Sequence, residues 1–231
     1  MRIHRLATVD STNLEAQRQV AAGEVGPLWI ISAEQTAGKG RLGRNWVSRS
    51  GNFYGTLLWP TRAPQNALAQ ASFAAAIAVH QTASEFVNEK RIALKWPNDC
   101  LLDGAKFCGI LTEGIAPGVL AIGIGINIAH VPDDLPYPAS RLETANVESV
   151  FEKLQLNLSN NFSIWNEGQG FESIRLEWMV RCPHLGKAVN VDGVAGHFEG
   201  LGSDGAFLLR QTDGECKQIY AGDVRLEYEK P

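Results

Sequence analysis

The spacing of apolar and polar positions predicts a strand–helix–strand pattern at the start of the chain. Residues 2–7 favour a short strand. Ser11 stands where the N-cap of a helix over residues 12–22 is expected, and Gly23 supplies the stop signal. The compact apolar run LWIIS at residues 28–32, bounded by turn residues, is typical of a buried strand.

The middle of the chain continues this mixture of elements. The run FYGTLLW at residues 53–59 predicts a strand that Pro60 ends. Residues 66–88 are rich in alanine and apolar nearly all round, as expected of a helix buried against a sheet. Turns of the Pro-Asn-Asp, Asp-Gly and Pro-Gly types then separate further strand-like segments. These segments are residues 92–96, 100–103, 107–113 and 119–128.

The pattern changes near residue 183. After a proline-rich loop at residues 132–138, apolar positions repeat at helical spacing, at Val147, Val150, Phe151, Leu154 and Leu158 and again at Phe171, Ile174 and Trp178. Residues 185–229 instead predict short strands divided by Asp-Gly turns. We therefore expect an α+β fold in which residues 1–184 form a mixed sheet with packed helices, and residues 185–231 a small β-barrel.

Composition narrows the functional classes. The 231 residues carry a formal net charge of -4, which argues against general binding to nucleic acid or to an anionic membrane. No apolar run approaches the roughly 20 residues that span a bilayer, and the first residues lack the apolar core of a signal peptide. The four cysteines lie far apart, which favours reduced thiols in a cytosolic protein over a disulfide framework or a zinc site.

The stretch GKGRLGRNWVSRSGN at residues 38–52 concentrates positive charge in this acidic chain. It contains four cations and interleaved glycines, and no Asp or Glu occurs between residues 35 and 84. Its Gly-x-Gly-x-x-Gly spacing matches a dinucleotide fingerprint, but no helix follows and the ribose-binding acid is missing. A solvated surface loop is the simplest alternative. Exposed backbone N–H groups beside cations favour instead a nucleotide-like anion as the ligand.

Five stretches, in this order, resemble the biotin protein ligase family. They are STN at residues 11–13, QTAGKGRLGR at 35–44 with Trp46, Ser48, Gly51 and Asn52, KWPND at 95–99, KFCGIL at 106–111 and GIGIN at 123–127. The resemblance covers nearly the whole chain. It implies a catalytic domain like that of the class II aminoacyl-tRNA synthetases, with a C-terminal barrel of the Src-homology type.

The resemblance also implies a reaction in two steps. The carboxylate of biotin attacks the α-phosphate of ATP, giving biotinyl-5′-AMP and pyrophosphate. A lysine of the biotin carboxyl carrier protein of acetyl-CoA carboxylase then takes the acyl group as an amide. A free carboxylate is a poor acyl donor, so activation needs positive charge where two anions meet, which agrees with a cationic loop and with Mg²⁺ as a cofactor.

On the biotin side, the resemblance assigns contacts to three regions. The side chains of Ser11, Thr12 and Asn13 would bind the ureido ring, although helix capping alone explains these residue types. The remaining implied contacts are Gln35, Gly38, Lys39, Gly40, Arg41, Lys106 and Gly109. Lysine at position 39 replaces the commoner arginine of the family, keeping the charge but losing the bidentate fork.

On the adenylate side, the implied residues are Arg41, Arg44, Trp46, Asn98, Lys106 and Asn127. Trp46 would stack on adenine, and the segment 137–142 would cover the base. Asn98 would offer an oxygen to Mg²⁺. Lys106 and Arg41 would stabilise negative charge during catalysis, and Asp99 would help to take a proton from the incoming lysine amine.

Alternatives stay open. Each motif has a structural explanation, such as a core tryptophan at Trp46, a turn at residues 97–99 or a solvated strand-edge lysine at Lys106. A lipoate–protein ligase and a non-catalytic binding module are the rival functions. The chain starts directly at the first expected catalytic strand, so no DNA-binding domain is expected. A homodimer through a sheet edge is left open.

Overall fold

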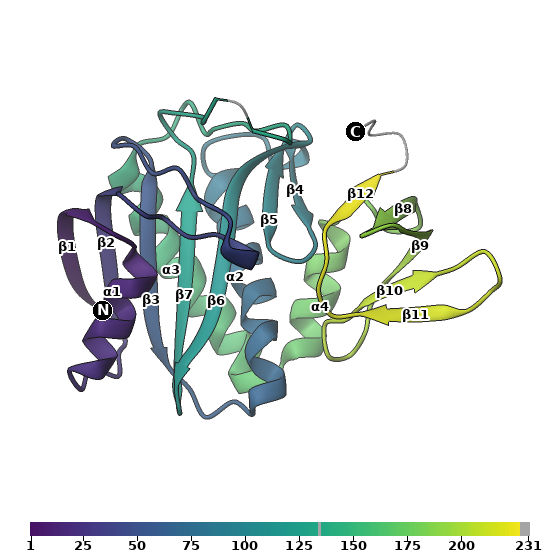
Figure 1. Cartoon of the computed structure of the whole chain (residues 1–231), viewed down its shortest axis with the longest axis horizontal. Coiled ribbons are helices and arrows are strands. Elements are labelled where there is room, and N and C mark those ends of the chain that lie inside the picture. The colour runs from purple at the N-terminus through teal and green to yellow at the C-terminus, as the bar shows by residue number, and fades with distance from the viewer. Residues whose placement is uncertain (134, 227–231) are drawn as a thin grey trace.

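A seven-stranded mixed sheet forms the centre of the molecule. The computed structural model describes residues 1–133 and 135–226. The strand order is β1-β2-β3-β7-β6-β5-β4, in which β1 and β2 are parallel and the other neighbours antiparallel (Figure 1). The strands are β1 (Arg2–Val9), β2 (Leu28–Gln35), β3 (Phe53–Pro60), β4 (Ile92–Lys95), β5 (Asp99–Leu102), β6 (Ala105–Ala116) and β7 (Val119–Ile126).

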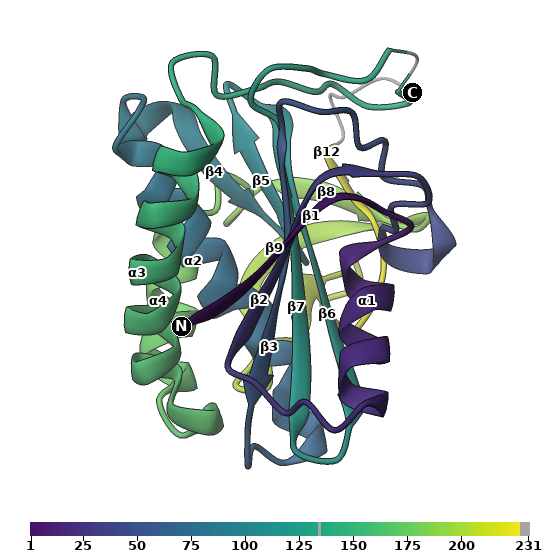
Figure 2. The same ribbon diagram turned by 90° about the vertical axis from the view of Figure 1, so that its left-hand side faces the viewer.

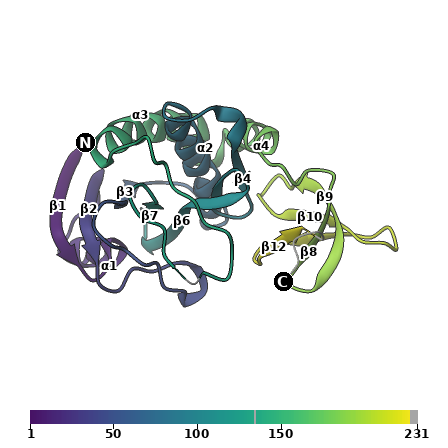
Figure 3. The ribbon, with the colours of Figure 1, turned by 90° about the horizontal axis from the view of Figure 1, so that it is seen from above.

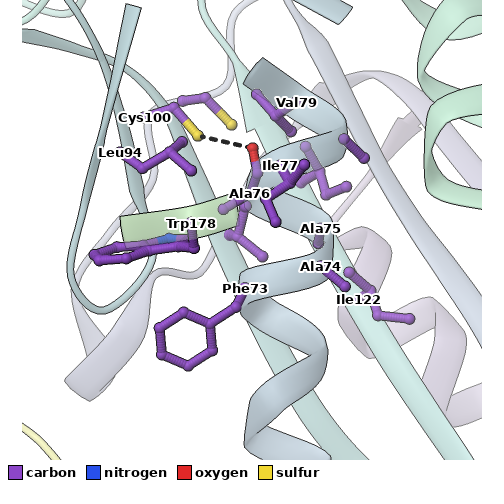
Figure 4. Packing of buried hydrophobic residues seen from close by; sticks show 14 of the residues in the cluster. Phe73, Ala74, Ala75, Ala76, Ile77, Val79, Leu94, Cys100, Ile122 and Trp178 are labelled. Atoms are coloured by element: carbon purple, nitrogen blue, oxygen red, sulfur yellow. Dashed lines mark hydrogen bonds between the residues drawn. The ribbon is translucent and has the colours of Figure 1, made fainter. Parts of the chain in front are cut away.

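Helices cover both faces of this sheet, unequally. Figure 2 shows α2 (Ala71–Ser84), α3 (Val147–Trp165) and α4 (Phe171–Val180) on one face and α1 (Thr12–Ala21) alone on the other. Nearly every side chain of α2 is buried, in agreement with its apolar composition all round. Figure 4 shows α2 with Leu94, Cys100 and Trp178 on one side of it and Ile122 of the sheet on the other. Because α1 is the one helix among the described residues on the opposite face, that face of the sheet is less covered.

Strand β7 is apolar on one face and nearly bare on the other. Ile122, Ile124 and Ile126 point into the large core with α2 and α3. The alternate positions, Gly123 and Gly125, carry no side chain on the α1 face. Because successive residues of a strand point to opposite faces, one short sequence both anchors the core and leaves space above the sheet.

The C-terminal segment forms a second, five-stranded antiparallel sheet. Its order is β11-β10-β9-β8-β12, and its strands are β8 (Ala188–Val191), β9 (Val194–Leu201), β10 (Phe207–Arg210), β11 (Cys216–Ile219) and β12 (Val224–Leu226). It lies beside the β4–β5 end of the main sheet (Figure 3). The rings of Trp96 and Phe207 are 5.2 Å apart, and Trp96 Nε1 donates to the carbonyl of Gly205 at 3.3 Å. The two sheets therefore share one continuous apolar core.

The predicted α+β class is confirmed, and several boundaries differ from the prediction. The expected helix 66–88 is a 3₁₀ segment, Gln65–Gln70, followed by α2, and β2 runs on to Gln35. The ladder order of the second sheet places β11 and β12 at its two edges. The end of the predicted barrel, residues 227–231, lies outside the described residues, as does residue 134 of the proline-rich loop. The division of the chain after residue 184 stays a prediction.

Candidate active site

A cavity of about 800 Å³ opens on the α1 face of the main sheet, above the bare positions of β7. Its walls come from the start of α1, the glycine-rich loop, the β4–β5 turn, β6, and residues 223–225 of the second sheet. Most of the predicted site residues line it, namely Ser11, Thr12, Asn13, Gln35, Lys39, Gly40, Arg41, Arg44, Trp46, Asn98, Asp99, Lys106 and Gly109. The sequence-predicted constellation is therefore brought together in one place.

The start of α1 forms a polar end of this cavity. Ser11 occupies the N-cap position, yet its side chain makes no capping hydrogen bond. Gln35 Oε1 accepts from both the backbone N–H and the hydroxyl of Thr12, at 2.8 and 3.1 Å. Gln35 Nε2 in turn donates to Ser48 Oγ at 2.8 Å. Helix capping thus does not explain the hydroxyl of Ser11, and the polar groups are organised around the cavity instead.

Asn13 is held by two residues that the sequence did not reveal. Its Nδ2 donates to Glu113 Oε2 at 2.7 Å, and its Oδ1 accepts from the hydroxyl of Thr56 at 2.6 Å. Thr56 is fully buried on β3, and Glu113 is half-buried on β6. The only signal for either contact was an isolated polar residue inside an apolar strand, which by itself indicates no partner.

The glycine-rich loop folds into a compact turn. Gly40 N donates to the carbonyl of Arg44 at 2.7 Å, and residues Arg41–Gly43 form a single 3₁₀ turn in which Leu42 has a φ of 55°. Gly38 does not line the cavity. A Cβ at Gly38 would lie 2.3 Å from the carbonyl oxygen of Trp46, so this glycine allows two loop segments to pack backbone to backbone.

Arg41 reaches from this loop to the β4–β5 turn. Its guanidinium is half-buried and donates from Nη1 to Asn98 Oδ1 at 3.3 Å. Burial lowers the pKa of Arg41 from its ordinary value, with partial compensation from Asp223 and Asp99. Asn98 Nδ2 donates to the carbonyl of Ile110 at 2.6 Å, so the side-chain oxygen of Asn98 points toward the cation. The side chain of Arg41 is therefore held at the cavity and does not extend freely into solvent.

Lys106 lies at the centre of the site. Its Nζ is 2.7 Å from Asp99 Oδ1 and lies 5.4 Å from the ring centre of Trp46 and 5.3 Å from that of Tyr137. Its backbone is pinned as well, because Lys106 N donates to the carbonyl of Pro138 and Ser140 N donates to the carbonyl of Lys106, both at 2.9 Å. Lys106 is thus a fixed, partly desolvated charge, and the solvated strand-edge alternative is wrong.

Trp46 lies flat over the glycines of the main sheet. A Cβ at Gly109 would meet its ring at 3.0 Å, and a Cβ at Gly125 would lie 2.5 Å from its Nε1. Nε1 is buried with no hydrogen-bond partner among the residues that the structure describes. Trp46 is therefore a cavity wall and not a residue of the main core. Whether adenine stacks on it stays a prediction.

Asn127 lies beside this wall and lines a smaller cavity with Trp46, Lys106 and Tyr137. Its Nδ2 donates to the carbonyl of Ser140 at 3.0 Å. The smaller cavity holds only about 20 Å³, close to the space of one water molecule. A nucleobase would fit only after the segment 137–142 or Trp46 moves, so the predicted cover of adenine by this segment stays a prediction.

The cavity is positively charged although the chain is acidic. The cations that line it are Lys39, Arg41, Arg44, Lys95, Lys106 and Arg225, and the acids are Asp99 and Asp223. Arg44 forms an ion pair with Asp223, which ties the glycine-rich loop to the second sheet. Positive charge in a partly closed cavity attracts anions, and it strengthens each contact by excluding water.

Over residues 1–133 and 135–226 no group of three or more His, Cys, Asp or Glu could hold a metal ion. Asn98 Oδ1, the predicted Mg²⁺ ligand, accepts instead from Arg41.

No helix in the described part of the chain is long and apolar enough to cross a membrane. Cys100, Cys108 and Cys182 are buried free thiols, and Cys216 is exposed.

Comparison with known proteins gives consistent findings. The model of the Biotin/lipoate A/B protein ligase family matches residues 6–129. A Biotin--[acetyl-CoA-carboxylase] ligase of Paracoccus denitrificans is 40% identical over 228 residues, which cover 90% of this chain and 94% of the relative. The Bifunctional ligase/repressor BirA of Bacillus subtilis (strain 168) is 32% identical over 213 residues, 85% of this chain and 65% of that protein.

Solved structures also resemble this chain over nearly its whole length, and a representative one can be described. It is a biotin protein ligase from Aquifex aeolicus in complex with biotin and ATP, with a TM-score of 0.84, 26% sequence identity, and coverage of 98% of both chains. This match includes the second sheet as well as the main one, since both lie within the aligned 98%.

Proposed function

Because the chain belongs to the Biotin/lipoate A/B protein ligase family, we propose that it is an ATP-dependent biotin protein ligase. It activates biotin as biotinyl-5′-AMP and transfers it to a lysine of a biotin carboxyl carrier protein. The observation that carries the proposal is the cavity itself. Hydroxyl and amide groups of residues 11–13 line one end, and Lys106 and Arg41 supply positive charge toward the other.

In the first step, a carboxylate oxygen of biotin attacks the α-phosphorus of ATP, and the bond to the β-phosphate oxygen breaks, so pyrophosphate leaves. Lys106 and Arg41 hold the two anions together and offset the charge that builds on the phosphate. Both cations are already ordered, by Asp99 and by Asn98 respectively, so little reorganisation is needed at the moment of reaction. Trp46 and the glycines beneath it exclude water from the mixed anhydride.

In the second step, the lysine amine of the carrier attacks the acyl carbon, the bond to the AMP oxygen breaks, and the amine proton must leave. Asp99, which lines the cavity, would take that proton. Mg²⁺ that enters with ATP would neutralise phosphate charge. Asn98 would contribute to holding it only by exchanging its 3.3 Å contact with Arg41, which is a long and replaceable hydrogen bond.

The proposed ligase also has a carrier partner, a cellular location and a possible mode of dimerisation. The carrier is a biotin-accepting domain, the protein works in the cytoplasm where ATP and the carrier are found, and a homodimer would use an edge of the main sheet. The outer strand β1 offers such an edge. The name of the Paracoccus denitrificans relative, a Biotin--[acetyl-CoA-carboxylase] ligase, supports the proposed carrier. The position of β1 at the edge of the sheet supports the proposed homodimer.

The deciding experiment is pyrophosphate release with ATP and Mg²⁺, comparing biotin, lipoate and no acid. We expect release only with biotin. Release with lipoate would keep the chemistry and change the substrate. No release with either acid would favour a non-catalytic binding module. Transfer of radiolabelled biotin to a purified carrier domain then tests the second step.

A further inference from the structure

Asn13 crosses the main sheet at Gly123, where β7 has no side chain in the way. Thr56 of β3 pairs with Gly123 of β7, and Gly123 pairs in turn with Leu111 of β6, two residues before Glu113. A Cβ at Gly123 would lie 2.2 Å from Asn13 Oδ1. Asn13 therefore rests directly on the backbone of β7, with Thr56 on one side and Glu113 on the other.

The two contacts fix which end of the amide faces which strand. An ionised carboxylate only accepts hydrogen bonds, so Glu113 requires the Nδ2 end of Asn13 on its side. Turning the amide over would set Asn13 Oδ1 against Glu113 Oε2, two acceptors at hydrogen-bond distance. The hydroxyl of Thr56, which can donate, then faces Asn13 Oδ1 at 2.6 Å. The carboxylate thus selects one orientation of a group that is otherwise nearly symmetric in shape.

We infer that Glu113 is a positioning residue for ligand binding: by fixing the amide of Asn13 over Gly123, it sets the second Nδ2 proton of Asn13 as a donor toward the cavity. The inference rests on the proposed function only in taking biotin as the ligand. Glu113 and Thr56 do not line the cavity, whereas Asn13 and Gly123 do. Glu113 therefore acts through Asn13 and not by touching the ligand.

The recognised group is a polar one that accepts a hydrogen bond, such as the ureido oxygen of biotin. An amide that can turn freely offers an acceptor half of the time, and an acceptor facing the ureido oxygen repels it. Loss of the Glu113 carboxylate should therefore weaken binding of the ureido head more than it slows chemistry at the carboxylate of biotin, which under the proposed function would lie at the Lys106 end of the cavity.

The test is a double-mutant cycle on biotin binding by the full chain, measured by calorimetry. Glu113→Leu should raise the Kd for biotin on the order of tenfold, as expected when a buried polar partner is left unpaired. Asn13→Ala should raise it as well. If Glu113 acts through Asn13, adding Glu113→Leu to Asn13→Ala should change the Kd less than twofold. Two fully additive effects would overturn the inference.

Further measurements separate positioning from simple loss of structure. Glu113→Gln can still offer an oxygen to Asn13, so it should recover much of the affinity. In pyrophosphate release, Glu113→Leu should raise the KM for biotin while kcat and the KM for ATP stay within about twofold. Thr112→Val, on the same strand but the opposite face, is the matched control and should leave the KM for biotin unchanged.

Failure of this inference is distinct from failure of the proposed function. If the unmodified chain binds biotin and releases pyrophosphate but the cycle is additive, the chain is a biotin ligase and Glu113 has no positioning role. If the unmodified chain releases pyrophosphate with neither biotin nor lipoate, the ligase function falls and the inference about biotin falls with it.

Discussion

Lys106 and Asp99 form an ion pair inside the cavity, with Nζ 2.7 Å from Oδ1 and side-chain exposures of 17% and 22%. The two strands that carry them are neighbours in the sheet, and the ammonium group lies 5.4 Å from the ring centre of Trp46 and 5.3 Å from that of Tyr137. The pair holds two groups with different proposed roles. The cation serves the first step of the reaction, and the carboxylate serves the second.

Lys106→Ala should reduce biotin-dependent pyrophosphate release by at least about 100-fold, because a preorganised charge at the reacting phosphate is lost. Release is measured with saturating ATP and biotin. Lys90→Ala, at an exposed lysine that does not line the cavity, is the control and should behave like the unmodified chain. A Lys106→Ala variant with unchanged release would remove Lys106 from the mechanism.

Asp99→Asn should separate the two steps. Adenylate formation should persist within about tenfold, since Lys106 keeps its charge, whereas transfer to the carrier lysine should slow by about 100-fold without the proton acceptor. The measurement is a single-turnover transfer from preformed biotinyl-5′-AMP to a carrier domain over a range of pH. Equal transfer rates for Asp99→Asn and the unmodified chain would show that another group takes the proton.

Arg41→Gly should leave adenylation largely alive and release the intermediate faster. A charge-assisted contact is worth about 1.5–3 kcal/mol, so the dissociation rate of biotinyl-5′-AMP should rise by roughly 10- to 100-fold. The rate is followed by exchange with unlabelled intermediate. Arg49→Ala removes a cation of the same loop that does not line the cavity and should have no such effect. Retention as tight as in the parent would sink the role of Arg41.

Gly125→Ala should displace Trp46. The added Cβ would lie 2.5 Å from the indole Nε1, closer than any real contact, so the ring must shift and the cavity wall with it. We expect a change in tryptophan fluorescence and a KM for ATP raised about 5- to 10-fold if adenine stacks on this ring. In Gly114→Ala the new methyl would meet the flexible ends of Leu68 at 3.1 Å and of Gln65 at 3.9 Å, which makes it the control. A shifted fluorescence with an unchanged KM for ATP would separate Trp46 from nucleotide binding.

Stability should fall between pH 6.5 and about 4 because of two buried histidines. Burial lowers the pKa of His80 to about 4, with Arg181 adding to the effect, and burial lowers that of His184 to about 4, with Lys95 and Lys187 adding. A histidine whose pKa is lower in the folded state binds its proton first in the unfolded state. The stabilisation is therefore present above pH 6.5 and is lost as the pH falls toward 4.

Each such group changes the free energy of unfolding by on the order of 3 kcal/mol across that range. Urea titrations at pH 7, 6, 5 and 4 measure it. His184→Asn should flatten the pH dependence in this window, whereas His197→Asn, at an exposed position of β9, should not. Identical slopes for His184→Asn and the unmodified chain would show that His184 does not govern the loss.

The sequence predicted well the features that depend on local repeats of apolar residues. The apolar periods gave the α+β class and nearly every strand, and the motifs of residues 11–13, 35–46, 95–99 and 106–109 meet in one cavity as the resemblance implied. The elements follow from side-chain patterns within a few residues. The meeting of the motifs in one cavity was implied by the family resemblance and not by local patterns.

Long-range contacts were beyond such reasoning. Glu113 contacts Asn13 at a separation of 100 residues, and Asp223 reaches Arg44 across 179. Pairings of this kind depend on how strands stack across the sheet, and no local spacing encodes them. For the same reason, the predicted metal oxygen of Asn98 was found facing Arg41, a neighbour brought in by the fold of the loop.

The glycines of β7 give the site an unusual genetic signature. In most ligand sites, the positions that tolerate few substitutions are those where a side chain contacts the ligand. Variants that lose this side chain are removed by selection. At Gly123 and Gly125 the reverse holds, since every possible replacement adds atoms into occupied space. A saturation library across residues 121–126 should therefore show a period of two, in which the isoleucines tolerate other aliphatic residues and the glycines tolerate nothing. The residues that form the floor of the cavity could then be identified from the frequency of each variant that remains after selection for activity.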